Sequence, residues 1–366
     1  MANNSLDKAR KAINEIDKKM AELFVQRMRC AEEVAEYKKE RGLSILDTAR
    51  EEEVVRRNSA YIDDEILREY YVNFLRENMA ISRAYQSRLM EGMKIAYSGT
   101  EGAFAHIAAS KLYPSANKVA FGDFAAAYRA VESGECDVAV LPVENSYNGE
   151  VGQVTDLMFS GSLYVNGMFD LPLTQDLLAK PGSSIEDIRE VVSHPQAFGQ
   201  CDEYIRRHGF ERHEFANTAL AARWVSESPD RTVAAIASRE AAEIFGLTVL
   251  DHDINESKSN STRFAIFSRA ANRRISKEEG VHSILLFTVR NEAGALAKAV
   301  DIIGHYGFNM RTLRSRPMKE LLWEYYFYLE AEGDIFSEKG QNLLRDMAPY
   351  CDRLKVVGTF ERHVML

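Results

Sequence analysis

Cysteine, proline and tryptophan are scarce in this sequence, which has four, eight and two of them among 366 residues. The cysteines form no Cys-x-x-Cys pair and no cluster with histidine at metal-ligand spacing. This excludes a disulfide-rich scaffold and the common zinc sites. We therefore expect no bound metal and a reducing, cytoplasmic location for the four thiols, which are Cys30, Cys136, Cys201 and Cys351.

Long hydrophobic runs are missing as well. No stretch approaches the ~20 consecutive apolar residues that a membrane-spanning helix needs. The first residues, MANNSLDKARKAINEIDKKMAEL, are charged throughout and lack the apolar stretch of a secretory signal. The formal net charge of -9 opposes binding to nucleic acid. The sequence thus predicts neither a membrane nor a nucleic-acid partner.

Proline is absent from Leu6 to Met90, where glycine is also rare. Apolar residues recur at helical spacing through this region, as in Ile13, Ile16 and Met20. We predict a long first helix that ends at Gly42, a second helix over about 47–58 and a third over about 63–90. The first domain, residues 1–91, is expected to be all α.

The pattern changes at Met93, where strand-like runs begin to alternate with helical segments. The runs are MKIAYSG, KVAFGD, DVAVLPVENS, REVVSHP, TVAAI and STRFAIFSR. Such alternation is typical of an α/β sheet. Two cycles of it, joined by an extended stretch over about 164–180, predict a two-lobed α/β domain over residues 92–270 that binds a small ligand between its lobes.

A polar, charged stretch over residues 269–280 is a predicted linker. After it, strand-like and helix-like segments follow in the order βαββαβ through residues 280–362. This order predicts a small α+β module with a ferredoxin-like fold. The chain as a whole is therefore expected to be a multidomain protein.

Three cations on the first predicted helix have a suggestive geometry. At 1.5 Å and 100° per residue, Arg27 and Lys38 point within roughly 20° of each other and lie roughly 16 Å apart. They could hold one small dianion between them. Arg10 lies roughly 25 Å from Arg27 along the same helix, too far to share that ligand. Arg10 could serve only the site of a second chain, which predicts an intertwined dimer.

Polar pairs on the other two helices fit such a site. Asp47 and Glu51 share a helix face, as do Ser82 and Gln86. A simpler interpretation is that Thr48 caps the second helix with Glu51 in a capping box, and that the cations face water. Spacing alone leaves both interpretations open.

The segment LDKARKAINEIDKKMAELFVQRMRCAEEVAEYKKERGLSILDTAREEEV resembles the all-helical chorismate mutases. That resemblance implies that Arg27 and a second chain's Arg10 hold the substrate carboxylates, and that Lys38 and Gln86 bind the breaking ether oxygen. It also implies that the ring hydroxyl and its neighbouring carboxylate are oriented by Asp47, Glu51 and Ser82. The rearrangement of chorismate needs no cofactor, because folding the substrate and stabilising charge on the ether oxygen suffice.

Four motifs in the α/β region place glycines or polar residues at strand ends, where α/β folds bind ligands. They are GTEGAFAH (99–106), PVENSYNG (142–149), SHPQAFGQC (193–201) and NSTRF (260–264). Taken singly, Glu144 could be a surface carboxylate and Thr262 an ordinary β-branched strand residue.

Together, in this order, the motifs resemble prephenate dehydratase, which implies a two-lobed α/β domain with a periplasmic-binding-protein-like fold. The resemblance implies Thr262 as the essential hydroxyl, with candidate contacts to prephenate from Glu144, Asn145, Ser193 and Gln200. Either Thr262 or Glu144 would supply the proton with which the ring hydroxyl leaves. One departure is that Thr100 and Ala103 replace the family's proline and threonine in the first motif.

The segments GALAKAV (294–300) and RSRPMKELLWEYYFYLE (314–330) resemble the ACT regulatory module, which binds phenylalanine at a dimer interface. The resemblance implies feedback inhibition, with effector contacts from Gly294, Ala295, Leu296 and Asn309. Arg314 stands where the family commonly has glutamate. A module that serves only for dimerisation is the alternative.

These resemblances predict a bifunctional enzyme of phenylalanine biosynthesis without a cofactor. It would convert chorismate to prephenate and prephenate to phenylpyruvate, as a homodimer or a dimer of dimers with L-phenylalanine as effector. One alternative is a monofunctional prephenate or arogenate dehydratase with a non-catalytic helical dimerisation domain. Another is an amino-acid sensor without activity, which would not need the polar set on the helices.

Overall fold

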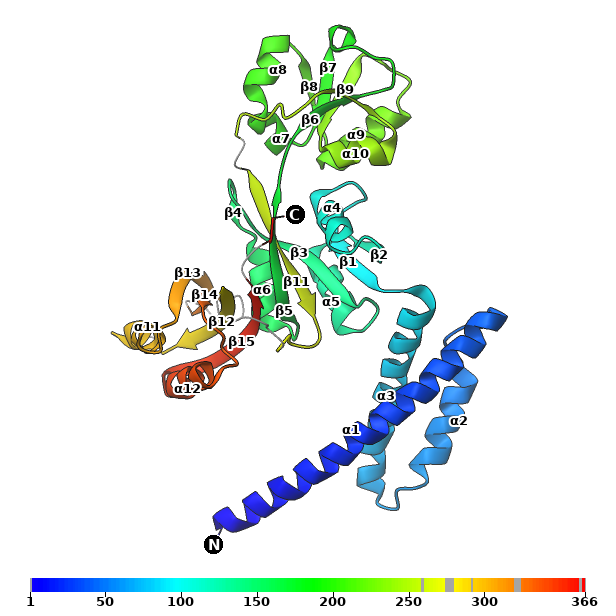
Figure 1. The fold of residues 1–366 in the computed structure, drawn as a ribbon, viewed down its shortest axis with the longest axis vertical. Helices are drawn as coiled ribbons and strands as arrows, with labels where there is room; N and C mark the ends of the chain where they lie inside the picture. The colour runs from blue at the N-terminus through cyan, green and yellow to red at the C-terminus, as the bar shows by residue number, and fades with distance from the viewer. Residues whose placement is uncertain are drawn as a thin grey trace. The chain divides into compact units, whose positions relative to one another are not determined.

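The structure is a computed structural model that describes residues 2–257, 260–273, 280–290, 292–318, 324–361 and 364–365. It divides into two compact units, Met1–Lys94 and Ile95–Leu366. Figure 1 shows the first unit as a group of helices and the second as sheets with helices packed on them. The end of the first unit lies within a few residues of the boundary predicted at residue 91.

The first unit consists of the three predicted helices: α1 (Ala2–Arg41), α2 (Thr48–Ser59) and α3 (Glu65–Glu91). Gly42 ends α1 with φ +63°, a conformation that glycine adopts without strain. Asp47 caps α2, since its carboxylate accepts the Arg50 N–H at 3.0 Å. The expectation that Thr48 is the cap is therefore wrong: Thr48 is the first residue of the helix.

Little of this helical unit is buried within one chain. Its buried apolar residues in the described chain are Ala31, Ala35, Leu75 and Met79, where α1 and α3 pack together. By contrast, the part of α1 before Arg27 exposes large apolar side chains along its length: Leu6, Ile13, Ile16, Met20, Leu23, Phe24 and Val25. A stripe of this size is unusual for a surface that remains in water.

The first lobe of the second unit is a mixed sheet with the strand order β16-β5-β11-β3-β1-β2, and β4 pairs with β3. β1 and β3 are parallel, whereas β11 runs antiparallel between β3 and β5. The strands are β1 (Lys94–Ser98), β2 (Asn117–Phe121), β3 (Val138–Asn145), β4 (Gly149–Glu150), β5 (Tyr164–Pro172), β11 (Ser261–Ser268) and β16 (Val364–Met365). The helices are α4 (Phe104–Leu112), α5 (Phe124–Glu132) and α6 (Gly152–Ser160).

The second lobe is a separate sheet with the order β10-β6-β9-β7-β8. Helices cover it on both sides, and two hydrophobic clusters fill the two interfaces. The strands are β6 (Asp176–Ala179), β7 (Glu190–Ser193), β8 (Glu211–Glu214), β9 (Val233–Ala237) and β10 (Thr248–Asp251). The helices are α7 (Pro195–Gln200), α8 (Asp202–His208), α9 (Thr218–Glu227) and α10 (Arg239–Phe245), with a 3-10 turn at Ile185–Asp187. The predicted two-lobed α/β arrangement is confirmed.

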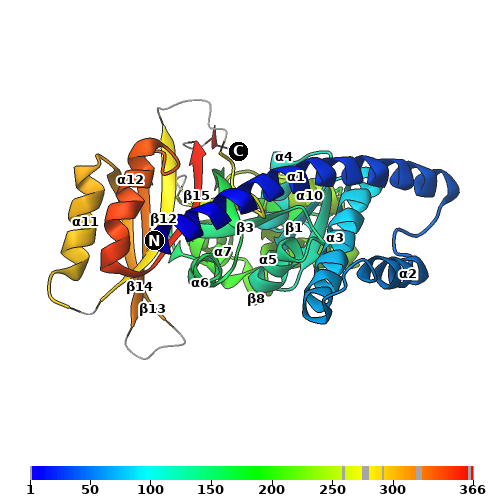
Figure 2. The same cartoon turned by 90° about the horizontal axis from the view of Figure 1, so that it is seen from below.

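The C-terminal module has the predicted βαββαβ order, and its sheet has the strand order β13-β14-β12-β15. Figure 2 shows α11 and α12 side by side on one face of this sheet. The elements are β12 (Val281–Val289), α11 (Ala295–His305), β13 (Asn309–Pro317), β14 (Tyr325–Glu332), α12 (Glu338–Met347), the 3-10 turn Ala348–Tyr350 and β15 (Cys351–Glu361).

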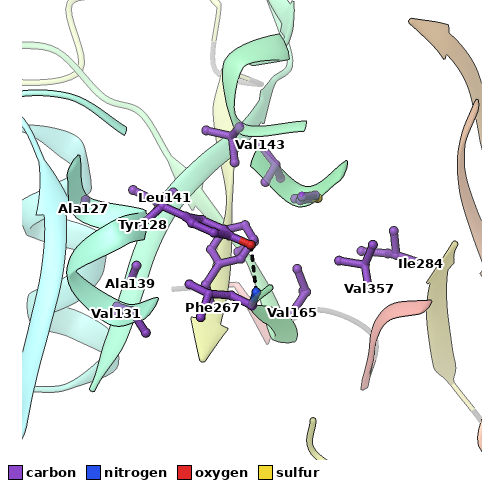
Figure 3. Packing of buried hydrophobic residues seen from close by; sticks show 14 of the residues in the cluster. Ala127, Tyr128, Val131, Ala139, Leu141, Val143, Val165, Phe267, Ile284 and Val357 are labelled. Carbon is purple, nitrogen blue, oxygen red and sulfur yellow. Dashed lines mark hydrogen bonds between the residues drawn. The ribbon is translucent and has the colours of Figure 1, made fainter. Parts of the chain in front are cut away.

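The C-terminal module does not stand apart from the first lobe, because one hydrophobic cluster includes residues of both. Ile284 and Val357 of the module lie beside Val165 of the first lobe (Figure 3). In the same cluster the buried Tyr128 hydroxyl accepts the Leu163 N–H at 2.9 Å. The predicted linker lies partly outside the described residues, since 274–279 are not among them. The lobe and the module are therefore joined by a shared core.

Three findings concern expectations from the sequence about the cysteines, a metal site and a membrane span. All four cysteines are free, and Cys136 and Cys201 are buried. Among the described residues no group of three or more histidine, cysteine or acidic side chains could hold a metal ion. No described helix is long and apolar enough to cross a membrane.

Candidate active sites

The helical unit brings Arg27 of α1 to α3. The Arg27 guanidinium donates to the Asn78 carbonyl at 3.1 Å and to the Ser82 hydroxyl. Ser82 in turn donates to the Asn78 carbonyl at 2.9 Å, so three polar groups meet where the helices cross. Burial lowers the pKa of Arg27, which still lies far above neutrality for a guanidinium. A permanent cation is thus held in a partly desolvated place.

Gln86 lies one turn beyond Ser82 on α3 and is only 8% exposed. In the described chain its buried Oε1 atom has no hydrogen-bond partner. A buried amide oxygen without a partner is costly, which makes it a candidate to receive a ligand's hydrogen or a water. Lys38 lies on α1 and donates to the Ile45 carbonyl at 2.5 Å.

In one chain, the structure does not bring three of the predicted site residues to Arg27, Ser82 and Gln86. They are Asp47, Glu51 and Arg10. Asp47 is exposed and serves as the cap of α2. Glu51 forms an ion pair with Arg83, which fastens α2 to α3. Arg10 is exposed on α1. Sequence reasoning missed Arg83 and Asn78, although Asn78 lies four residues before Ser82 on the same helix face.

An open groove of about 1110 Å³ runs along α1 and α3 on the side where α1 is apolar. Arg27 and Asn78 line one part of it, and aromatic and aliphatic side chains line the rest, including Met20, Phe24 and Phe74. Arg27 and the part of the uncovered apolar stripe nearest to it, from Met20 to Val25, thus share one groove.

The second unit has a cleft of about 300 Å³ whose lining comes from both lobes. From the first lobe, Asn145 at the end of β3 and Thr262 on β11 lie opposite each other in register. The Asn145 amide donates to the Thr262 hydroxyl at 2.9 Å, and both residues are 8% exposed. The two residues predicted from separate motifs are therefore direct neighbours.

The Asn145 side chain is fixed from both of its ends. Its oxygen accepts the backbone N–H groups of Tyr147 and Asn148 at 3.0 and 2.9 Å. Its nitrogen also donates to the Asn260 side chain at 3.2 Å. Because the amide nitrogen already donates to Thr262, the threonine hydroxyl keeps its own hydrogen for another acceptor.

The second lobe contributes Gln200, whose side-chain oxygen accepts from the Gln175 amide at 3.4 Å. Four more residues of the second lobe line the cleft. His194 and Gln196 belong to the motif SHPQAFGQC, and Asn217 and Thr218 lie at the start of α9. Sequence reasoning missed His194, although it follows a strand directly. Ser193 is not brought to the cleft lining: it is fully buried and donates to the Ile236 carbonyl at 2.6 Å.

The first motif forms a turn before α4, with Gly99 and Gly102 at φ +105° and +83°. Of the residues in this motif, only Phe104 lines the cleft. The Thr100 hydroxyl, which stands at the family's proline position, is buried without a hydrogen-bond partner in the described chain. The turn therefore supplies an aromatic wall and the start of a helix.

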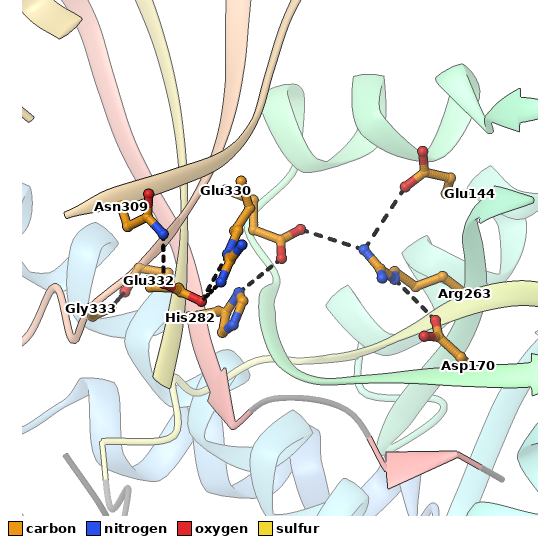
Figure 4. A network of polar contacts seen from close by, with 10 residues as sticks. Glu144, Asp170, Arg263, His282, Asn309, Glu330, Glu332 and Gly333 are labelled. Carbon is orange, nitrogen blue, oxygen red and sulfur yellow. Dashed lines mark hydrogen bonds and ion pairs between the residues drawn. The ribbon is translucent and has the colours of Figure 1, made fainter. Parts of the chain in front are cut away.

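Glu144 points away from the cleft and is not among its lining residues. It forms an ion pair with Arg314 of β13, and its Oε2 lies 3.9 Å from Arg263 Nη1. Arg263 also donates to Asp170 at 3.0 Å and lies 3.8 Å from Glu330 (Figure 4). The structure does not bring Glu144 to the place where it was expected as a proton donor.

Burial acts to lower the pKa of Arg263, but its bond to Asp170 and the charges of Asp170, Glu330 and Glu144 outweigh burial and raise it. Glu330 is buried, and its Oε1 lies 3.0 Å from Nδ1 of His282 (Figure 4). This network therefore joins strands of the first lobe to strands of the C-terminal module through charged side chains.

The four residues expected to bind phenylalanine lie at the ends of α11 and β13. Gly294 adopts φ +84° as the residue before α11, which begins with Ala295 and Leu296. Asn309 is exposed and donates to Glu332 at 2.8 Å (Figure 4). None of the four lies in the cavities described above.

Two family models match the chain. Residues 9–87 match chorismate mutase type II, and residues 95–272 match prephenate dehydratase. The two matches divide the chain at the same place as the two compact units.

Relatives match over one or both units. A bifunctional chorismate mutase/prephenate dehydratase of Neisseria gonorrhoeae is 32% identical and covers 97% of each chain. An arogenate dehydratase/prephenate dehydratase 2 of Arabidopsis thaliana is also 32% identical, but over 73% of this chain and 72% of its own length.

Several solved structures match 74% of the chain, among them the following two. Prephenate dehydratase from Arthrobacter aurescens in complex with L-Phe is 25% identical, with a TM-score of 0.66 over 90% of its length. GqqA, described as a novel type of quorum-quenching acylase, is 29% identical, with a TM-score of 0.68 over 98% of its length. Since proteins of this fold are described by different activities, the fold alone does not fix the reaction. The match to the Neisseria relative over both units, together with the two family models, does decide the family: this chain belongs to the bifunctional chorismate mutase/prephenate dehydratases.

Proposed function

We propose that the chain carries out two consecutive steps of phenylalanine biosynthesis at two separate sites. The helical unit rearranges chorismate to prephenate, and the cleft of the second unit converts prephenate to phenylpyruvate, water and carbon dioxide. The observation that carries the proposal is that each unit has its own polar site of the kind that its reaction needs. The family matches of the two units agree with this division.

The first reaction breaks an ether C–O bond and forms a C–C bond within one molecule, so it needs no nucleophile and no proton. What the protein must do is fold the enolpyruvyl arm over the ring and stabilise the charge that develops on the ether oxygen. Arg27, beside Ser82, is suited to a substrate carboxylate, since guanidinium groups bind carboxylates through two hydrogen bonds. Lys38 and Gln86 would hydrogen-bond the ether oxygen. Asp47 and Glu51 would orient the ring hydroxyl after rearrangement of their present contacts.

A second copy of the chain completes this site in the proposal. Arg10 cannot reach the Arg27 of its own chain, because 17 residues of straight helix separate them by about 25 Å. The uncovered apolar stripe of α1 and the groove beside Arg27 support an intertwined dimer that buries the stripe. In that dimer, Arg10 from each chain would bind the second carboxylate in the other chain's site.

The second reaction aromatises the ring. The C–O bond to the ring hydroxyl breaks as the ring carboxylate leaves as carbon dioxide, and the electron pair from the broken C–C bond enters the ring. The departing hydroxide takes up a proton and leaves as water. Thr262 is the proposed donor of the hydrogen bond to this oxygen, because Asn145 orients its hydroxyl and leaves the hydrogen available.

Other residues of the cleft would bind the rest of prephenate. Gln200 lies across from the Asn145 and Thr262 pair and is suited to a carboxylate or the keto group. The first residues of α4 and α9, Phe104 and Thr218, also line the cleft, so two helix N-termini with free N–H groups are available to the carboxylates. In this arrangement Ser193, the first residue of the third motif, supports β7 through its bond to the Ile236 carbonyl.

The C-terminal module is proposed to be an ACT module that binds L-phenylalanine and inhibits the dehydratase. Its βαββαβ order and the positive φ of Gly294 before α11 support this assignment. Effector contacts would come from Gly294, Ala295, Leu296 and Asn309 when two modules meet in a homodimer or a dimer of dimers.

The test is incubation of the full-length protein with chorismate, followed by product analysis with and without L-phenylalanine. We expect prephenate and then phenylpyruvate, with the second product reduced by the effector. Chorismate that remains unchanged would exclude the mutase step and favour a dehydratase with a non-catalytic helical unit. Prephenate and arogenate supplied in parallel decide which of the two the cleft accepts.

A further inference from the structure

Two pairs of neighbours on β3 and β11 occupy opposite faces of the same two strands. Asn145 pairs with Thr262 on the cleft side, and the adjacent Glu144 pairs with Arg263. Successive side chains of a strand point to opposite faces, so Glu144 and Arg263 lie behind the cleft residues. They border a nearly filled space together with Arg314 and Glu330 of the C-terminal module. Any displacement of Glu144 or Arg263 therefore acts on the two cleft residues through a single peptide unit.

The charges behind the cleft are nearly balanced. Three carboxylates, those of Glu144, Asp170 and Glu330, surround the Arg263 guanidinium, and Arg314 adds a second cation at Glu144. The side chains of Glu144, Arg263 and Arg314 are between 26 and 30% exposed, and that of Glu330 is 5% exposed. Screening by water is thus reduced, and each charge matters more than it would on an open surface.

Removal of Arg314 would leave three carboxylates around one guanidinium. Arg263 holds Asp170 by a direct hydrogen bond at 3.0 Å, whereas its distances to Glu144 and Glu330 are 3.9 and 3.8 Å. Glu144 has its direct bond with Arg314. Without that bond, repulsion from Glu330 and Asp170 would favour movement of Glu144 and of the end of β3 that carries Asn145.

We propose that Arg314 is a positioning residue for the dehydratase reaction: by holding Glu144, it keeps Asn145 and Thr262 in the geometry that the leaving hydroxyl requires. Arg314 touches no substrate in this inference, which rests on the proposed role of the cleft.

The experiment compares Arg314→Gln with Arg311→Gln in the full-length chain. Arg311 is a matched control, because it lies on the same strand and also forms an ion pair with a glutamate, Glu332, on the exposed part of the module. Dehydratase kcat and KM are measured with prephenate, the mutase rate of the same sample reports on its concentration, and thermal unfolding reports on the folding of the second unit.

We expect Arg314→Gln to lower kcat roughly tenfold with little change in KM, within the range that coupled neighbouring residues show. Arg311→Gln should remain within about twofold of the wild type. Arg314→Lys, which keeps the charge, should fall between the wild type and Arg314→Gln. If Arg314→Gln does not fold, as judged by thermal unfolding, the lysine variant decides: a kcat below that of the wild type supports the inference and a wild-type kcat overturns it.

A double-mutant cycle separates positioning from a general weakening of the module. In a Glu144→Gln background, Arg314→Gln should change kcat by less than about twofold, because its target is already gone. Losses that multiply, or equal kcat for the wild type and Arg314→Gln, would refute the inference. A wild-type protein without any dehydratase activity would instead refute the proposed function of the cleft.

Discussion

The substitution Thr262→Val tests the cleft most directly. Valine has nearly the shape of threonine, so the change removes the hydroxyl and keeps the β-branched strand residue. If this hydroxyl stabilises the leaving oxygen, its loss should lower dehydratase kcat by about 10² to 10³, the range measured for a single donor aimed at a developing charge. KM for prephenate should change much less, because the donor acts mainly in the transition state.

The effect of Thr262→Val on stability should be small by comparison. The Asn145 amide loses one acceptor at 2.9 Å, but it keeps the Asn260 side chain at 3.2 Å and the Ser261 carbonyl at 3.1 Å. Since no donor is left without a partner, the expected cost is about 1 kcal/mol. The folded population should therefore remain almost unchanged, and a drop in kcat cannot be ascribed to unfolding.

Thr288→Val is the matched control. Thr288 is 7% exposed, against 8% for Thr262, and its hydroxyl likewise accepts one hydrogen bond at 2.9 Å, from the Arg353 N–H. It lies in the C-terminal module, away from the cleft lining. Thermal unfolding should shift by similar amounts in both variants, while steady-state phenylpyruvate formation should fall only in Thr262→Val. Equal kcat in the two variants would remove Thr262 from the mechanism.

Three further outcomes are expected. Lys38→Ala should lower mutase turnover by about 10² or more and leave dehydratase turnover within about twofold, which chorismate and prephenate assays of one sample can compare. Millimolar L-phenylalanine should inhibit phenylpyruvate formation from prephenate; unchanged activity would point first to Arg314 as the cause. Burial lowers the pKa of Lys355 to about 8, below the ordinary 10.5, so the unfolded chain binds more protons between these values. The unfolding free energy of the wild type relative to Lys355→Met should therefore rise as the pH increases through this window, and chemical denaturation at pH 8 and pH 10 measures it.

Much of the fold could be predicted because local patterns and tertiary structure agree. The proline-free, periodic N-terminal segment forms three helices that end within about two residues of the predicted positions, at Arg41, Ser59 and Glu91. The strand-like runs after Met93 form strands for the same reason, since they are apolar, β-branched and bounded by turn residues. The βαββαβ order of the last segment followed from the same signals.

The cap of α2 shows where local patterns fail. Asp47 and Thr48 are both good capping residues, and a sequence gives no means to choose between neighbours that both fit. In the structure the extended backbone of Asp47 lets its carboxylate accept the Arg50 N–H. The residue predicted to orient a substrate is thus engaged in a structural contact in the single chain.

The direction of Glu144 could not be predicted for a different reason. Its motif placed it beside Asn145, but which of two adjacent strand residues faces the cleft depends on how the sheet packs. Here the C-terminal module covers the other face, and Arg314 and Arg263 attract the carboxylate there. No local pattern in either segment predicts a contact between Glu144 and Arg314, which are 170 positions apart.

The two sites differ in how much of each one chain provides. In the cleft, Asn145 and Thr262 are buried, hydrogen-bonded and opposed by Gln200 of the second lobe, so a single chain already encloses the proposed place of reaction. On α1, Arg27 forms hydrogen bonds to α3, while the apolar residues before it are exposed. Arg10 lies far from Arg27 along the same helix. Burying that stripe against a second chain would release water from apolar surface and bring a second arginine to the groove in one event. The free energy that holds such a dimer together would therefore also assemble the mutase site, whereas the cleft is lined by the two lobes of a single chain.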